Sequence, residues 1–196
     1  MDDNTNAITK TETGLVQSKL DVALAQRAQA HNTVLALDYS GSMASLDANG
    51  ERRIDALRAV VTMLRSKGIT ARQLIFSNAV AWSDVIPEPA GGTDMLKALQ
   101  FCAQISAKHI VLVSDGEPTD ATKDAVLDYA RTLGAKIDAY YVGDKHNTAA
   151  IDFMAQLATN TGGLSGAVSF KELGVKIAGA LAVNAESAEG GKSIAL

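Results

Sequence analysis

Five oxygen-bearing side chains in three short segments of the chain are suited to hold a hard metal ion. A carboxylate and two hydroxyls come first, at Asp38, Ser40 and Ser42, and Thr93 and Asp115 add a third hydroxyl and a second carboxylate. Oxygen donors favour Mg²⁺ or Mn²⁺, with Ca²⁺ as an alternative, and disfavour zinc, which prefers nitrogen and sulfur. Three neutral donors and two carboxylates would leave an octahedral ion one open position. The sequence therefore predicts a metal site that can accept an acidic side chain from another molecule.

Two strongly apolar segments lead into the two carboxylates. Residues 33–37 precede Asp38, and residues 109–114 precede Asp115. Nearly continuous apolar runs are typical of strands buried on both faces of a parallel sheet. Ligands of open α/β sheets bind beyond the carboxyl ends of the strands, where the strand order reverses. We therefore expect both carboxylates at the same rim of one sheet.

The rest of the chain alternates between helical and strand-like patterns. This alternation predicts an α/β fold, with a Rossmann-like open and mostly parallel central sheet and helices on both faces. We expect one domain at 14–183, between a flexible lead at 1–13 and a flexible tail at 184–196. The expected helices lie near 14–30, 54–67, 93–103, 120–133, 148–161 and 170–182, and the further strands lie near 72–76, 80–82 with 85–86, 137–142 and 167–168.

Composition excludes several classes of partner. The chain has 196 residues and a formal net charge of -4, with no run of Lys or Arg, which argues against nucleic acid. No stretch approaches a membrane span and the first residues lack the apolar core of a signal peptide, so we expect a cytoplasmic protein and no membrane partner. The single cysteine, Cys102, lies on an apolar helical face and is expected to be buried. His31, His109 and His146 are not spaced as ligands or as a catalytic pair.

The order, spacing and context of three segments resemble those of a von Willebrand factor type A (vWA) domain. The resemblance covers residues 33–182 and implies a complete metal-ion-dependent adhesion site, in which a partner's Glu or Asp completes the metal shell. It implies direct ligation by the two serines and the threonine, and a role often mediated by water for the two aspartates. The segments are Asp38-x-Ser40-Gly41-Ser42, Gly91-Gly92-Thr93-Asp94 and Ser114-Asp115-Gly116-Glu117-Pro118-Thr119-Asp120.

Several neighbours of these segments have simpler interpretations. Asp94 and Asp120 are expected to cap their own helices or to lie in the first turn, and Glu117 is expected to be a solvated loop carboxylate. Trp82 is either a buried aromatic at the sheet edge, which we favour, or a surface anchor for a partner.

A metal site without a catalytic base predicts a protein-binding module rather than an enzyme. A Mg²⁺-dependent hydrolase or phosphatase is less favoured, because the chain has no G-x-x-x-x-G-K-[ST] loop and no basic residue within the three motif segments. The resemblance also implies an alternative, in which the chain is a non-catalytic bacterial subunit. Its partner would then be an AAA+ ATPase of the MoxR type acting in trans, or a tellurium-resistance or stress-response complex.

Overall fold

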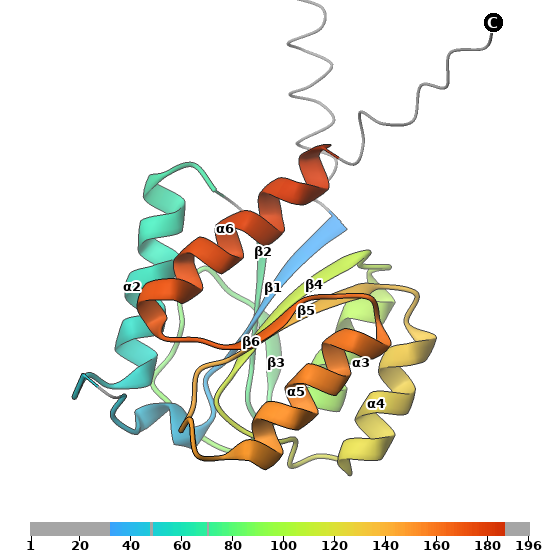
Figure 1. Ribbon diagram of the computed structural model, residues 1–196, viewed down its shortest axis with the longest axis horizontal. Coiled ribbons are helices and arrows are strands. Elements are labelled where there is room, and N and C mark those ends of the chain that lie inside the picture. Colours follow the sequence, from blue (N-terminus) through green and yellow to red (C-terminus); the bar gives the residue numbers. More distant parts are fainter. Residues whose placement is uncertain (1–31, 48, 70, 187–196) are drawn as a thin grey trace, which may run out of the picture.

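The two strands that precede the carboxylates are neighbours at the centre of a six-stranded sheet. The computed structural model describes residues 32–47, 49–69 and 71–186. Its strands follow the order β3-β2-β1-β4-β5-β6, and only β3 runs antiparallel to its neighbour (Figure 1). The predicted open, mostly parallel sheet is confirmed. The strands are β1 (Thr33–Asp38), β2 (Arg72–Phe76), β3 (Val80–Trp82), β4 (His109–Ser114), β5 (Lys136–Tyr141) and β6 (Ser165–Ala167).

Every residue of β1 and β4 is buried, which explains why both strands are mostly apolar. Leu37 pairs with Val113 in the parallel register, so the next residues, Asp38 and Ser114, lie level with each other at the end of the strands. Because the strand order reverses between β1 and β4, this rim is the ligand-binding position of such sheets.

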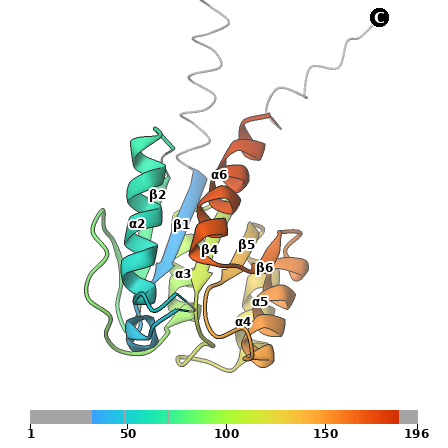
Figure 2. The same ribbon diagram turned by 60° about the vertical axis from the view of Figure 1, so that its left-hand side comes forward.

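Helices cover both faces of the sheet, as predicted (Figures 1 and 2). Successive strand residues point to opposite faces, so Ala36 packs with one group of helices and Leu37 with the other. On the Leu37 face lie α2 (Arg53–Ser66) and α6 (Phe170–Glu186). On the Ala36 face lie α3 (Met95–Gln104), α4 (Lys123–Thr132) and α5 (Thr148–Asn160).

The predicted strand at 85–86 is wrong. Val85 is exposed, and the carbonyl of Ile86 accepts hydrogen bonds from Arg58 Nε and Nη2, at 3.1 and 3.0 Å, while Arg58 Nη2 also donates to the Pro87 carbonyl at 2.7 Å. An arginine side chain from α2 therefore takes the acceptors that a strand ladder would need.

The bounds of other elements also differ from the prediction. β6 begins at Ser165, two residues before the predicted strand, because the chain reaches β5 already at Gly163, where a Cβ would lie 1.8 Å from the Ile137 oxygen. The last helix ends at Glu186 rather than near Ala182. The predicted lead at 1–13, the helix at 14–30 and residues 187–196 of the predicted tail lie outside the described residues.

Three predicted side-chain environments can be compared with the structure. Cys102 is buried as predicted, and burial raises the pKa of its thiol to about 12. Trp82 is half-buried at the edge strand, edge-to-face with Phe101 at a centroid distance of 5.4 Å and under the guanidinium of Arg72. His109 is buried, and its Nε2 lies 2.8 Å from Asp138 Oδ2. In the described part of the chain, no helix combines the length and the apolar character that crossing a membrane requires.

Candidate metal centre

The Asp38 carboxylate is fully buried at the end of β1 and has donors on both oxygens. The Ser40 N–H donates to Oδ1 at 2.7 Å, and the Ser114 hydroxyl donates to Oδ2 at 2.6 Å. Burial raises the pKa of Asp38 to about 7; these hydrogen bonds oppose the rise, and the charge of Asp115 adds to it. A cation beside this carboxylate would favour its ionised form.

A short turn after β1 brings the two serines next to Asp115. This turn is the 3₁₀ helix η1 (Gly41–Ala44), which is anchored by the buried Met43. The hydroxyl oxygens of Ser40 and Ser42 lie 3.0 Å apart, and the Ser42 hydroxyl donates to Asp115 Oδ1 at 2.6 Å. Because Ser42 donates its single hydroxyl hydrogen to Asp115, the Ser40 hydroxyl donates to Ser42, and one lone pair of Ser42 remains available to a cation.

Thr93 is held between the η1 turn and the loop that follows β4. The Gly41 N–H donates to the Gly91 carbonyl at 3.0 Å, which joins the first two motif segments. Thr93 donates its N–H to Thr119 Oγ1 at 2.8 Å and accepts the Thr119 N–H at 3.0 Å, which joins the second and third. Gly91 has a φ of +73°, a left-handed conformation that favours glycine.

The hydroxyls of Thr93 and Ser42 flank the same glycine. A Cβ at Gly116 would lie 3.8 Å from Thr93 Oγ1 and 3.9 Å from Ser42 Oγ. The structure therefore brings all five predicted residues to one rim of the sheet. In the described part of the chain, no three His, Cys, Asp or Glu side chains are grouped to hold a metal ion, so a cation here would depend on hydroxyl oxygens.

The prediction missed a basic residue at this rim. Arg53 Nη1 donates to Asp115 Oδ2 at 2.7 Å, and the Asp115 side chain is completely buried while that of Arg53 is 14% exposed. Arg53 is the first residue of α2 and lies outside the three motif segments. A faint sequence signal exists, because the arginine pair at 52–53 opens a helix where the dipole favours acidic residues.

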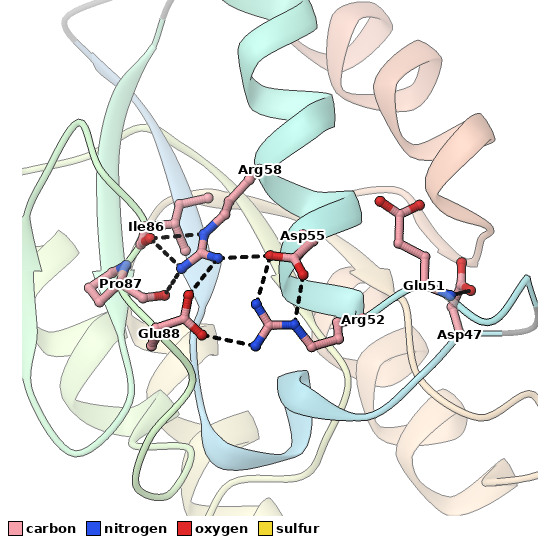
Figure 3. A network of polar contacts seen from close by, with 8 residues as sticks. All are labelled: Asp47, Glu51, Arg52, Asp55, Arg58, Ile86, Pro87 and Glu88. Atoms are coloured by element: carbon pink, nitrogen blue, oxygen red, sulfur yellow. Dashed lines mark hydrogen bonds and ion pairs between the residues drawn. The ribbon is translucent and has the colours of Figure 1, made fainter.

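The neighbouring arginine, Arg52, points elsewhere (Figure 3). It donates to Asp55 at 2.6 Å and to Glu88 at 2.9 Å, and Arg58 donates to the same two carboxylates. The Arg52 side chain is 41% exposed and that of Glu88 is 66% exposed, so these ion pairs contribute little to stability. The network ties the start of α2 to the loop after β3.

The prediction that Asp120 caps the helix that follows it is wrong. Its carboxylate accepts the backbone N–H groups of Leu96 and Lys97, at 3.3 and 2.9 Å, so it caps α3, while α4 begins three residues later. Asp94 holds the N-cap position of α3 but makes no side-chain cap bond, and is ion-paired with Lys97. The Glu117 side chain is 35% exposed, and its Oε1 lies 2.7 Å from Nζ of Lys123, the first residue of α4.

A pocket of about 440 Å³ adjoins the Asp115 side of the rim, and Arg53 forms part of its wall. Its other walls come from the loop after η1, from the end of β5 and from the segment between β6 and α6. Apolar side chains of Leu46, Tyr141, Val168 and Phe170 line it.

No family model matches the chain, and no curated protein matches it in sequence. Solved structures do match. The von Willebrand factor type A structure from Catenulispora acidiphila superposes with a TM-score of 0.62 and 16% identity, over 78% of this chain and 42% of that one. The fold is a von Willebrand factor type A fold. The chain thus spans less than half the length of that structure.

Two further structures extend the likeness to the vWA fold. The vWA domain of SpRpn10 has a TM-score of 0.54 and 12% identity, over 83% of this chain and 98% of that domain. The pilus adhesin SpaC from Lactobacillus rhamnosus GG has a TM-score of 0.56 and 14% identity, over 79% of this chain and 30% of the adhesin.

Proposed function

We propose that this chain is a protein-binding module that holds a divalent metal at the rim of β1 and β4 and captures an acidic side chain of a partner. The observation that carries the proposal is the hydrogen-bonded series from Ser40 through Ser42 to Asp115, beside the buried carboxylate of Asp38. These groups come from two loops that are far apart in sequence, since Ser42 and Asp115 are 73 residues apart.

The donor set fits a hard cation. Ser40, Ser42 and Thr93 would bind the metal directly, and Asp38 and Asp115 would act through water or through the hydroxyls that they contact. Oxygen donors suit Mg²⁺, with Mn²⁺ and Ca²⁺ as alternatives. When bound, the metal would supply an electrophilic position for a carboxylate. This suits the binding of a partner rather than catalysis.

The serines are arranged as ligands rather than as nucleophiles. A nucleophilic serine needs an adjacent base that takes its proton. The Ser42 hydroxyl donates to the carboxylate of Asp115, but the other oxygen of that carboxylate is bound by Arg53, and the Ser40 hydroxyl contacts Ser42 rather than a base. We therefore propose no catalytic role for this rim.

A protein partner fits the surroundings of the site. The pocket shares Arg53 with the rim, since Arg53 lines the pocket and contacts Asp115, and its apolar side chains suit a partner segment that carries both acidic and apolar residues. Among the structures with the same fold, SpaC is a pilus adhesin. That likeness concerns the fold, and its extension to this chain is part of the proposal.

Calorimetric titration with Mg²⁺ tests the metal site. We expect one binding site in the unaltered chain and a large loss of affinity in Ser42→Ala and Asp38→Ala. The matched control is Ser45→Ala, because Ser45 is exposed in the adjoining loop and its contacts at the site are made by its backbone. Equal Mg²⁺ binding by Ser42→Ala and the control would overturn the ligand assignment.

Partner capture tests the second half of the proposal. Proteins retained by the immobilised chain are compared in Mg²⁺, in EDTA and with Asp38→Ala. We expect the Mg²⁺ sample alone to retain a specific partner, and substitution of one acidic residue in that partner to abolish retention. The same partners in all three samples would rule out metal-dependent capture.

A further inference from the structure

We infer that Arg53 is a resident counter-charge that weakens the binding of a divalent cation at this rim by competing for Asp115. The inference rests on the proposed function, since it concerns the same metal site. It assigns to this chain a low-affinity metal centre whose strength is set by a residue from outside the metal-binding segments.

The contact is direct and shielded from water. Arg53 Nη1 lies 2.7 Å from Asp115 Oδ2, while Asp115 Oδ1 accepts the hydroxyl of Ser42 at 2.6 Å. One carboxylate thus joins a proposed metal ligand on one side to a permanent cation on the other. With its side chain 14% exposed, the guanidinium is poorly screened by solvent, and its field acts on the metal position more strongly than that of a surface arginine.

The position of Arg53 is unfavourable apart from this contact. It is the first residue of α2, where the helix dipole repels a cation. Its Nε is buried and has no hydrogen-bond partner, and a buried guanidinium with an unpaired nitrogen is destabilising. Arg52, one residue earlier, shows that an arginine at this helix end can instead reach surface carboxylates. Arg53 is directed inward, and Asp115 is the carboxylate that holds it.

The charge balance gives the direction of the effect. Asp38 and Asp115 would present two negative charges to a cation if both were ionised, and Arg53 cancels one of them. A divalent ion that enters beside Ser42 must therefore share Asp115 with a guanidinium and approach a like charge. Removal of the Arg53 charge should therefore strengthen cation binding. We expect an effect of about tenfold or more, because the guanidinium and the metal would lie within one side-chain length of each other in a poorly solvated site.

The experiment is a calorimetric titration of the full chain with Mg²⁺ alone and with Mn²⁺ alone. We expect Arg53→Gln to bind either ion at least about tenfold more tightly than the unaltered chain. Arg53→Lys, which keeps the charge, should stay close to the unaltered chain. The matched control, Arg52→Gln, removes the same charge from the exposed network and should leave the affinity unchanged.

A second readout does not depend on binding heats. Without metal, Arg53→Gln should melt at a lower temperature than the unaltered chain, because Asp115 is left buried without its counter-charge, and Mg²⁺ should restore more stability to this variant than to the unaltered chain. Should Arg53→Gln fail to fold, Arg53→Met, which retains the apolar stem, takes its place.

The outcomes separate the two proposals. If the unaltered chain binds Mg²⁺ and the uncharged variants bind it equally or more weakly, the role of Arg53 is overturned while the metal site stands. If the folded unaltered chain and the folded variants all fail to bind either ion, the proposed metal site and the inference fall together. If Arg53→Gln binds Mg²⁺ more tightly than the unaltered chain, and the double variant Arg53→Gln with Ser42→Ala loses this binding, both the metal site and the role of Arg53 are supported.

Discussion

Replacement of Ser114 by alanine tests whether the hydrogen bonds to Asp38 hold the rim together without any metal. The Ser114 hydroxyl donates to Asp38 Oδ2 at 2.6 Å and accepts the Gly116 N–H at 3.2 Å, and the side chain of Asp38 is completely buried. A hydrogen bond to a charged group contributes about 1.5–3 kcal/mol to stability. At a pH above the value of about 7 to which burial raises the pKa of Asp38, the carboxylate is ionised and the full loss should be seen.

The assay is urea unfolding at pH 8 in EDTA, which removes any contribution from a divalent ion. We expect Ser114→Ala to lower the free energy of unfolding by about 1.5–3 kcal/mol with an unchanged denaturant slope. Ser66→Ala is the matched control, because the Ser66 hydroxyl donates to a carbonyl of its own helix on the exposed surface. If the two variants lose equal stability, the reasoning about the buried carboxylate is refuted.

Three further predictions concern the framework around the rim. Asp138→Ala removes the carboxylate that pairs with the buried His109 and should lower the free energy of unfolding by about 3–5 kcal/mol. Asp128→Ala, in the exposed pair with Arg131, should change it little, and urea unfolding compares the two variants. Burial opposes ionisation of Asp138, but its hydrogen bonds with His109 and the Leu164 N–H, together with the charge of Lys136, lower its pKa overall. The loss should therefore shrink as the pH falls below about 4, and a constant loss would contradict this. Gly163→Ala would place a Cβ 1.8 Å from a backbone oxygen of β5 and should lower the melting temperature, whereas Gly179→Ala, in open space on α6, should raise it slightly; equal shifts would count against the close approach. With a pKa raised by burial to about 12, Cys102 should resist thiol reagents at pH 8 until urea unfolds the chain, and rapid labelling of the native protein would contradict its burial.

Much of the architecture could be predicted because the patterns that indicate strands and helices lie within short stretches of the sequence. Most residues of the runs at 33–37 and 109–114 are apolar because both faces of these strands are covered, and this pattern is typical of central strands of a parallel sheet. Once both strands are placed in one sheet, their ends must meet at one rim. The gathering of Asp38 and Asp115 there follows from topology rather than from any local pattern.

Three of the misses, those at 85–86, Asp120 and Arg53, involve side chains that act far from their own position in the sequence. Asp120 accepts the N–H of Leu96 in α3, 24 residues before it, and Arg58 reaches the carbonyl of Ile86, 28 residues away. The Arg53 contact with Asp115 spans 62 residues. Periodicity and capping rules describe neighbours along the chain, so they assign such residues to their own element and cannot show which distant group they contact.

The central placement of β1 and β4 also bears on folding kinetics. Ser114 contacts Asp38 across 76 residues of chain, so the rim cannot form before β1 has paired with β4. Parallel sheets with such distant pairings assemble slowly, because the entropy of closing a long loop must be lost first. A group that binds this rim contacts only the finished pair of strands. Its effect should be a longer lifetime of the native state against unfolding, with little change in the rate of refolding.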